Sequence, residues 1–250
     1  MIYLCSDKDK VRSVIDKAFG CTCIRNTILL YLNSYGAQFE FAQFYIQCTQ
    51  DANTDTALVL RYNQTVYCIT EDCADLPELM SFFVGFTDTT LISDRVLHNQ
   101  TNEPLGCETG AVMSKSGIAQ LVQNPKILLC SEPKPVCRLV SEEMPEHEKT
   151  DFFLNTAHQM RHGQLSVYAY YDGLSPMSVA SVFHNGTGEA VIPFVYTGDY
   201  FRGNGYSKQI LSAVCSDAET TYQLLCEAHN IEFYKKCGFT QVSQWVKYSL

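Results

Sequence analysis

The chain has 250 residues, a formal net charge of −9 and a hydrophobic fraction of 46%. This length allows one large hydrophobic core or two smaller ones, and the composition is too apolar and too aromatic for a disordered protein. The negative charge, with no block of lysine or arginine, disfavours nucleic acid and anionic membranes as partners. A partner that carries an amine is mildly favoured by the same charge balance.

The N-terminal sequence and the cysteine pattern indicate a cytoplasmic protein. "MIYLCSDKDK" has charges where a secretion signal would be apolar, and no apolar run is long enough to span a membrane. None of the twelve cysteines has a partner at C-x-x-C spacing, and many lie in apolar, strand-like runs such as "TVYCIT". We therefore expect buried free thiols in a reducing compartment, and no metal site.

The first half of the chain predicts an α/β domain over residues 1–131. Apolar residues at helical spacing in 11–35 predict two helices separated near Gly20. "FAQFYIQC" predicts a strand, and "TALVLRYNQTVYCIT" predicts two strands joined at Asn63-Gln64. "DLPELMSFFVGF" predicts a helix with Pro77 near its start, and "TTLIS" predicts a strand. Residues 98–116 are rich in turn residues, and 117–129 predict a short helix before the apolar run "KILLCS".

Proline and acidic residues near 132–135 mark the expected boundary of a second domain, 132–250. In chain order we expect a strand at "VCRLV", a helix at "EKTDFFLNTAHQM", three strands at "QLSVYAYYDG", "MSVASVFHNG" and "EAVIPFVYT", a helix after Arg202, a buried strand at "TYQLLCEA", a short helix at "NIEFYKKC" ended by Gly238, and a final strand or hairpin. This order predicts an α/β fold in which helices flank a mixed sheet. The first half has a similar order of elements, which suggests a duplication.

The stretch "YFRGNGYSKQIL" joins the third of these strands, ending near Thr197, to a helix expected to begin near Gly203. The first N–H groups of a helix have no intrahelical acceptor and lie at the positive end of its dipole, so they bind anions. Gly203 and Gly205 leave these groups uncovered, and Arg202 adds a positive charge. The arrangement suits a pyrophosphate, although an ordinary turn that needs glycine for its backbone angles would use the same residues.

A second motif, "NIEFYKKCGF" at 230–239, follows after one strand. Together the two motifs resemble the GNAT superfamily of acyl-CoA N-acyltransferases over about residues 135–250. The first family signature, Arg/Gln-x-x-Gly-x-Gly/Ala, is matched by "RGNGYS" at 202–207, with Ser207 as the departure. The second signature, in which a tyrosine follows an asparagine and precedes Gly-Phe, is matched by Asn230, Tyr234, Gly238 and Phe239.

This resemblance implies an acyl-coenzyme A site. In the family, the strand before the glycine loop diverges from its neighbour and the pantetheine arm lies between them, while the pyrophosphate lies on the amides of the loop. The family's asparagine contacts the cofactor arm, and its tyrosine protonates the leaving thiolate, which here points to Tyr234. The implied cofactor-binding residues are Val195, Tyr196, Thr197, Arg202, Gly203, Asn204, Gly205, Tyr206, Ser207 and Asn230.

The chemistry of acyl transfer adds further candidates. Attack of an amine on a thioester gives a tetrahedral oxyanion, which a backbone N–H of Val195 or Tyr196 could stabilise. Free alkyl amines are mostly protonated near pH 7, so a base must take a proton, directly or through water. Glu189, at the start of the fourth strand of the domain, is our candidate base; His184 and Asp172 are alternatives. For Tyr234 the alternative role is a core aromatic beside Phe233.

We therefore expect an N-acetyltransferase that uses acetyl-CoA, without a metal, to acylate a small-molecule or protein amine, acting as a monomer or a homodimer. The alternative is a non-catalytic acyl-CoA-binding sensor or scaffold. The sequence has no G-x-S-x-G elbow, P-loop or H-E-x-x-H motif. In the first half, "TEDCADLPEL" stands where a glycine loop would be. Its acidic residues Glu71, Asp72 and Asp75 would repel a pyrophosphate, so we expect no cofactor there.

Overall fold

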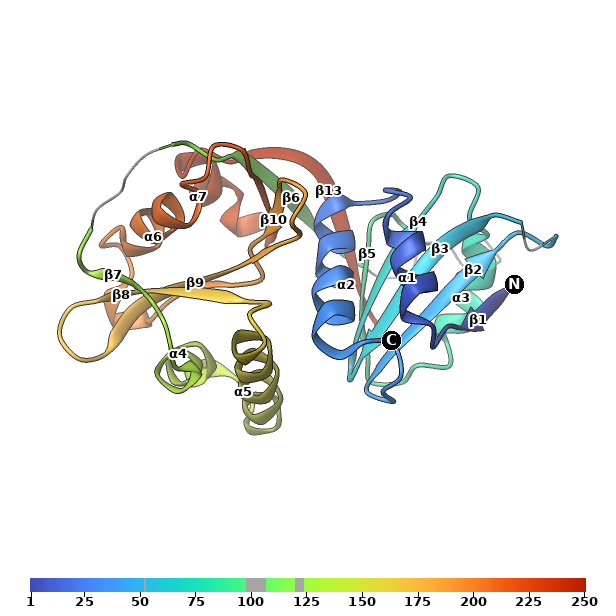
Figure 1. Cartoon of the computed structure of the whole chain (residues 1–250), viewed down its shortest axis with the longest axis horizontal. Helices are drawn as coiled ribbons and strands as arrows, with labels where there is room; N and C mark the ends of the chain where they lie inside the picture. The colour runs from blue at the N-terminus through green and yellow to red at the C-terminus, as the bar shows by residue number, and fades with distance from the viewer. Residues whose placement is uncertain (52, 98–106, 120–123) are drawn as a thin grey trace. The chain divides into compact units, whose positions relative to one another are not determined.

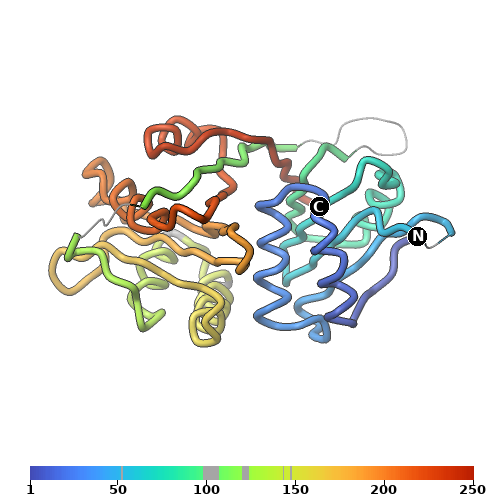
Figure 2. The backbone as a smooth tube through the Cα atoms, turned by 45° about the horizontal axis from the view of Figure 1, so that its top comes forward, coloured from blue at the N-terminus to red at the C-terminus, as the bar shows by residue number. Residues whose placement is uncertain are grey.

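The computed structural model describes residues 1–51, 53–97, 107–119 and 124–250, and for Glu143 and His147 it describes the backbone. The chain forms two compact units. The first contains Met1–Met113, Leu225–Ile231 and Gln241–Leu250, and the second contains Ser114–Leu224 and Glu232–Thr240. Both are mixed α/β structures (Figure 1, Figure 2). The domain boundary between residues 131 and 132 stays a prediction.

The sheet of the first unit follows the predicted order of elements. Its strands are β1 (Ile2–Leu4), β2 (Ala42–Cys48), β3 (Asp55–Tyr62), β4 (Thr65–Thr70), β5 (Thr90–Ser93) and β13 (Thr240–Ser249), and its helices are α1 (Lys8–Ile15), α2 (Thr22–Tyr35) and α3 (Leu76–Phe83). Neighbouring strands in the order β1-β2-β3-β4-β5-β13 are antiparallel except the parallel pair β4–β5. The predicted hairpin turn at Asn63 is confirmed, and its φ of +48° suits asparagine.

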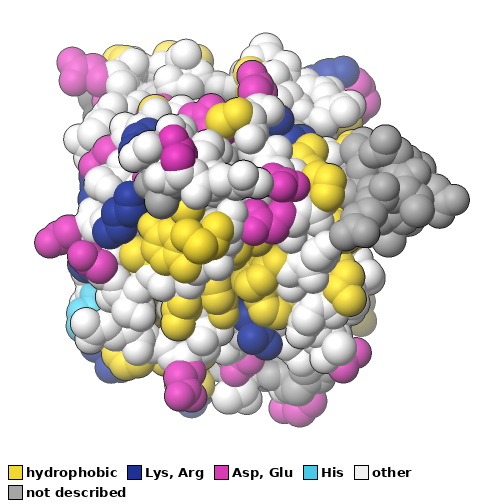
Figure 3. Space-filling view, turned by 90° about the vertical axis from the view of Figure 1, so that its right-hand side faces the viewer, with side chains coloured by type: hydrophobic (Ala, Val, Ile, Leu, Met, Phe, Trp, Pro, Cys, Tyr) yellow, Lys and Arg dark blue, Asp and Glu magenta, His cyan; other side chains and the backbone are white. Residues whose placement is uncertain are grey.

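Side-chain caps and burial on both faces explain these elements. Asp7 accepts hydrogen bonds from the first amides of α1, and Asp75 does the same for α3, whose first turn also contains Pro77. The first six residues of β3 are buried, so helices cover both faces of the sheet at this strand. Val59, Leu79 and Tyr248 belong to one cluster of buried residues. Apolar side chains also reach the surface on the face seen in Figure 3, among scattered charged ones.

The second unit contains β7 (Ile127–Leu129), α4 (Pro133–Val140), η1 (Ser141–Glu143), α5 (Glu146–Arg161), β8 (Ser166–Tyr171), β9 (Pro176–His184), β10 (Glu189–Val191), β11 (Val195–Thr197), η2 (Asp199–Phe201), α6 (Tyr206–Val214), β12 (Thr221–Glu227) and α7 (Ile231–Lys236). The strands β12-β10-β9-β8-β7 are neighbours in this order, and β11 pairs with β9. The pair β10–β12 is parallel and the others are antiparallel. Helix α6 covers one face of β8 and β9, and α4 and α5 cover the other (Figure 1). β6 (Glu108–Ser116), η3 (Ala228–Asn230) and β12 lie where the chain passes between the units.

Three sequence predictions were wrong in detail. "VCRLV" belongs to helix α4 and not to a strand, because prolines begin the helix and Val136, Cys137 and Val140 share its buried face. Residues 108–116 form strand β6 and not turns. "EAVIPFVYT" forms two strands, because Pro193 lacks the N–H that a continuous strand would donate. The predicted helix in 117–129 lies partly on 120–123, outside the described residues.

Two kinds of feature are absent from the described ranges. Within those ranges, no helix has both the length and the apolar character needed to cross a membrane. In the same part of the chain, no three histidine, cysteine, aspartate or glutamate side chains gather in a way that could hold a metal ion.

Candidate functional site

The glycine loop leads from β11 to α6. Gly203 and Gly205 have φ values of +82° and +76°, a region that side chains other than glycine rarely adopt. A Cβ atom built on either residue would meet no other atom of the chain within 4 Å. The backbone angles therefore explain the choice of glycine, and the space above both residues is open.

Helix α6 begins at Tyr206, later than the predicted start near Gly203. Gly205 is its N-cap and provides no capping side chain. The first hydrogen bond along the helix runs from Gln209 N to Gly205 O at 3.2 Å. The amides of Tyr206, Ser207 and Lys208 therefore have no acceptor within the helix, and they are available to an anion.

Arg202 is tied to the end of β11. Its Nε donates to Thr197 O at 3.2 Å, and its guanidinium forms an ion pair of 2.6 Å with Asp199 and lies 5.8 Å from the centre of the Tyr196 ring. Asp199 partly balances the charge of Arg202, so the helix amides carry much of the attraction for an anion. Asn204 stabilises the loop from within, since its side chain donates to Phe201 O at 3.0 Å.

A cluster of hydroxyl groups joins the start of α6 to the sheet. Ser178 Oγ lies 2.6 Å from Thr197 Oγ1 and donates to Tyr196 O at 3.0 Å, and Thr197 Oγ1 is in contact with Ser207 Oγ. The departure from the family signature at Ser207 is thereby explained, because its hydroxyl is directed to Thr197. Sequence reasoning missed Ser178; the small polar residues within the strand "MSVASVF" were the available signal.

The pairing of β11 decides which of its amides are accessible. Ser181 N donates to Phe194 O at 3.0 Å, and Gly198 N donates to Met177 O at 3.1 Å. Because alternate residues of an antiparallel strand direct their N–H and C=O groups to the partner, Val195 and Thr197 direct theirs away from β9. Of the two predicted oxyanion donors, Val195 has the suitable orientation, whereas the N–H of Tyr196 faces β9.

Strand β11 also diverges from β12, the strand with which β10 pairs. Ile192 N still donates to Gln223 O of β12 at 2.9 Å, but Pro193 has no N–H, and Phe194 N turns to Ser181 Oγ at 3.1 Å. In the part of the sheet described here, β11 pairs with β9 alone. This is the divergence that a pantetheine arm between two strands requires.

Tyr234 and Asn230 fall in different compact units. Tyr234 is half-buried in α7, and its ring packs edge-on against Phe239, with 5.8 Å between ring centres, while the adjacent Phe233 is more exposed. Asn230 is half-buried at the end of η3, among the residues of the first unit. The roles of both residues stay predictions.

The candidate bases lie away from Val195. Glu189 accepts a hydrogen bond of 3.0 Å from Asn185 in the β9–β10 turn. Its neighbour Ala190 pairs with His184 of β9, and Val195 pairs with Ala180, four residues or roughly 13 Å along β9. Proton transfer would therefore need water. Asp172 forms an ion pair of 2.9 Å with Lys126. Burial lowers the pKa of His184, with the carboxylate of Asp217 opposing the shift, so burial favours the neutral imidazole.

Part of the chain matches a known protein family. Residues 134–239 match the profile of the Acetyltransferase (GNAT) family. Among curated proteins, none matches the sequence.

Three solved structures illustrate the similarity in fold. A Drosophila protein has a TM-score of 0.64 at 11% identity, with 98% of this chain and 97% of that chain covered. A tandem GNAT protein from the clavulanic acid biosynthesis pathway, solved without AcCoA, has a TM-score of 0.57 at 10% identity, with 99% and 97% covered. A structure named as a GNAT-family acetyltransferase from Novosphingobium aromaticivorans has a TM-score of 0.56 at 16% identity, with 87% and 94% covered. Residues 134–239 therefore form a domain of the GNAT acetyltransferase family, in a chain whose fold is similar over almost its whole length to that of a tandem GNAT protein.

Proposed function

We propose that the protein transfers an acetyl group from acetyl-CoA to an amine by direct attack of the amine on the thioester. The observation that carries this proposal is the uncovered start of α6, where three amides without intrahelical acceptors follow two open glycines inside a GNAT domain. A helix N-terminus of this kind favours a diphosphate through its N–H groups and its dipole.

The strand before the loop would hold the rest of the cofactor. The N–H groups of Val195 and Thr197 point away from β9; that of Thr197 would bond the pantetheine arm as a partial strand, and that of Val195 stays available to the thioester oxygen. Thr197 O already accepts from Arg202, so the remaining backbone acceptor on this edge is Val195 O.

The reaction needs one oxyanion donor and two proton movements. The amine nitrogen bonds to the acyl carbon, and the N–H of Val195 stabilises the negative oxygen. The C–S bond then breaks, and Tyr234 gives a proton to the leaving thiolate. The proton of the amine passes through water to Glu189, with His184 as the alternative base. Coenzyme A and an N-acetyl product are released.

Two glycine variants test the cofactor site. Gly205→Ala forces a side chain into the left-handed region and places a methyl group at the mouth of α6. We expect its affinity for coenzyme A, measured by calorimetry, to fall by about tenfold or more, a loss of at least ~1.4 kcal/mol.

Gly163→Ala is the matched control. Gly163 has a φ of +67° with nothing within 4 Å of a built Cβ, and it follows α5, away from the loop. It should have a similar backbone cost and unchanged affinity. Equal affinities for all three proteins would contradict the site. Tight binding of coenzyme A without thiol release from acetyl-CoA over a broad panel of amines would favour a sensor or scaffold.

A further inference from the structure

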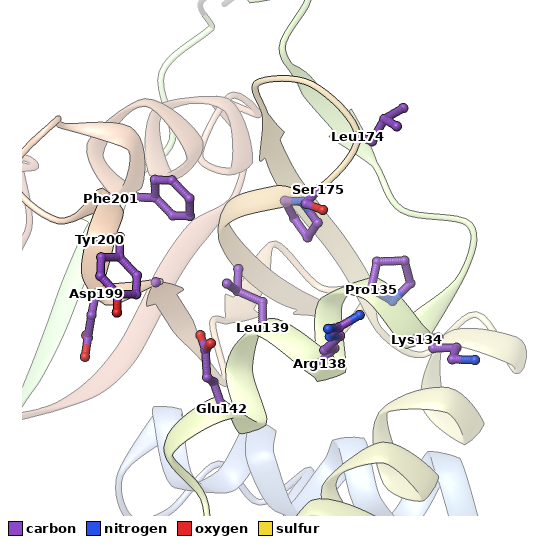
Figure 4. A pocket seen from close by; sticks show the side chains of 12 residues that line it. Lys134, Pro135, Arg138, Leu139, Glu142, Leu174, Ser175, Asp199, Tyr200 and Phe201 are labelled. Atoms are coloured by element: carbon purple, nitrogen blue, oxygen red, sulfur yellow. The ribbon is translucent and has the colours of Figure 1, made fainter.

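A pocket of about 500 Å³ opens in the second unit at the carboxyl end of β11. Residues of α4, the turn between β8 and β9, and the segment that follows β11 line it (Figure 4). Its volume is in the range of small-molecule sites, roughly 300–1,000 Å³. No residue of this pocket has a role in the chemistry proposed above.

The charges around the pocket favour an anion. Lys134 and Arg138 are four residues apart, so they share one face of α4, and both line the pocket (Figure 4). Of the acidic residues in the lining, Asp199 is ion-paired with Arg202 outside the pocket, and Glu142 contributes one negative charge. The lining therefore holds two cations and two carboxylates; because Arg202 balances Asp199 from outside, Glu142 is the carboxylate that opposes Lys134 and Arg138, in a chain with a net charge of −9.

Two apolar side chains of the remaining lining are exposed to an unusual degree. Leu174 is 100% exposed and Tyr200 is 94% exposed, whereas a ligand with an apolar body would cover both. Gly198 allows close packing of its segment on α4, since a Cβ there would lie 3.1 Å from Leu139 Cδ1. The pocket thus offers apolar walls next to two cations.

The pocket begins a few residues along the chain from the proposed reaction centre. Gly198 follows Val195 by three residues, about 10 Å along an extended strand. Helix α4 lies on the face of β9 opposite α6, where the diphosphate would bind (Figure 1). An acceptor that approaches the thioester from the α4 face has this pocket along its path.

We propose that the pocket binds the far end of the acyl acceptor, which carries a carboxylate about 10 Å from the reacting amine, with an apolar segment between them. Lys134 and Arg138 bind the carboxylate, and Leu174 and Tyr200 cover the apolar segment. This inference rests on the proposed function and names the class of amine. Compact amines and diamines are then poor acceptors.

A series of acceptors of graded length tests the proposal. Thiol release from acetyl-CoA is measured with ω-aminocarboxylates from aminobutyrate to aminoundecanoate, and with alkylamines and α,ω-diamines of matched length. We expect kcat/KM to peak near aminooctanoate and to exceed that of octylamine and diaminooctane by about tenfold, through KM. Equal rates for the three classes at every length, or a preference for diamines, would overturn the proposal and leave the transferase function standing.

Charge-removing variants assign the effect to the pocket. In the double variant Lys134→Gln, Arg138→Gln, the advantage of aminooctanoate over octylamine should disappear through KM, with kcat and the octylamine rate unchanged. Lys236→Gln, which removes an exposed charge from the same unit outside the lining, should keep the advantage. An advantage that survives the double variant overturns the assignment.

A binding measurement separates this proposal from the transferase function. The protein saturated with coenzyme A is titrated calorimetrically with aminooctanoate and with octylamine. Carboxylate-dependent binding that the double variant loses would support the pocket even in a protein without turnover. Absence of such binding in the unmodified protein counts against the pocket whatever the turnover.

Discussion

At the scale of single residues, Tyr234 is the position where packing and chemistry are most easily separated. Its ring packs against Phe239, and this contact does not need the hydroxyl. We expect Tyr234→Phe to lower kcat by roughly 10²-fold, the usual contribution of a general acid, while KM stays unchanged.

The control for this variant is Tyr168→Phe in β8, which removes a hydroxyl from the same unit and should keep full activity. An unchanged kcat in Tyr234→Phe would leave Tyr234 as a packing residue. A variant that loses both kcat and thermal stability would also leave Tyr234 as a packing residue, because the substitution would then act through folding.

The residues of the cofactor loop were predictable because their chemistry is local. Gly203 and Gly205 sit between a strand and a helix in the sequence, and the structure gives both the left-handed backbone that glycine allows. The orientation of Val195 was not predictable, since it depends on the register of β11 against β9. Ser178 was missed for the same reason, because its partner Thr197 is brought to it only by strand pairing.

At the scale of elements, α1 is held to β3 by one buried carboxylate. Asp55 is 7% exposed, and it accepts from Lys10 at 3.0 Å and is in contact with Lys17. Burial alone would raise the pKa of Asp55, but the hydrogen bonds from Lys17 and Lys10 hold it below its ordinary value. The carboxylate therefore stabilises the fold above the ordinary aspartate pKa, and this contribution is lost as the pH falls through the lowered pKa.

Asp55→Asn should lower the free energy of unfolding by about 1–2 kcal/mol at pH 7, a modest figure because both lysines are half-exposed. The difference from the unmodified protein should shrink as the pH falls below the ordinary aspartate pKa. Urea unfolding at several pH values measures it. Glu40→Gln, at an exposed carboxylate before β2, is the control. A difference that is constant with pH would contradict the assignment.

Elements with strong local signals were predicted, and those decided by tertiary contacts were not. Helices α2 and α5 and the β3–β4 hairpin follow from spacing and turn residues. The short apolar run "VCRLV" is compatible with a strand and with a helix. Only its packing against the sheet decides for the helix. The break at Pro193 was visible in the sequence, but its consequence, a strand β11 paired with β9 alone, is a property of the sheet.

At the scale of the whole molecule, each unit contains two parallel strands with a helix between them in the sequence. The units differ in the groups that bond to the backbone at the end of the first of these strands. In the second unit these are β10 and β12 with α6, and in the first they are β4 and β5 with α3. Thr70, at the end of β4, directs its N–H toward β5, because Glu71 N donates to Thr56 of β3. Asp94 accepts from that N–H at 3.3 Å and from Thr70 Oγ1 at 3.0 Å.

The start of α3 is likewise satisfied from within the first unit. Asp75 caps the helix by accepting from Glu78 N at 3.0 Å, whereas the N-cap of α6 is a glycine. Arg95 donates to Thr70 O at 3.2 Å, so both backbone groups of Thr70 are occupied by side chains. The backbone groups that would bind a diphosphate and a pantetheine arm in the second unit are thus occupied in the first by carboxylates and an arginine.

One molecule of coenzyme A should therefore bind per chain. Calorimetry of the full chain should give a stoichiometry of one, and Ser207→Glu, which places a negative charge at the mouth of α6, should abolish all of the heat. Glu78→Gln, at the start of α3, is the matched control and should leave the heat unchanged, since the first unit takes no part in binding. A second binding event, or heat that persists in Ser207→Glu, would mean that Asp75 and Asp94 yield to the cofactor. The first unit would then be a second acyl-CoA site.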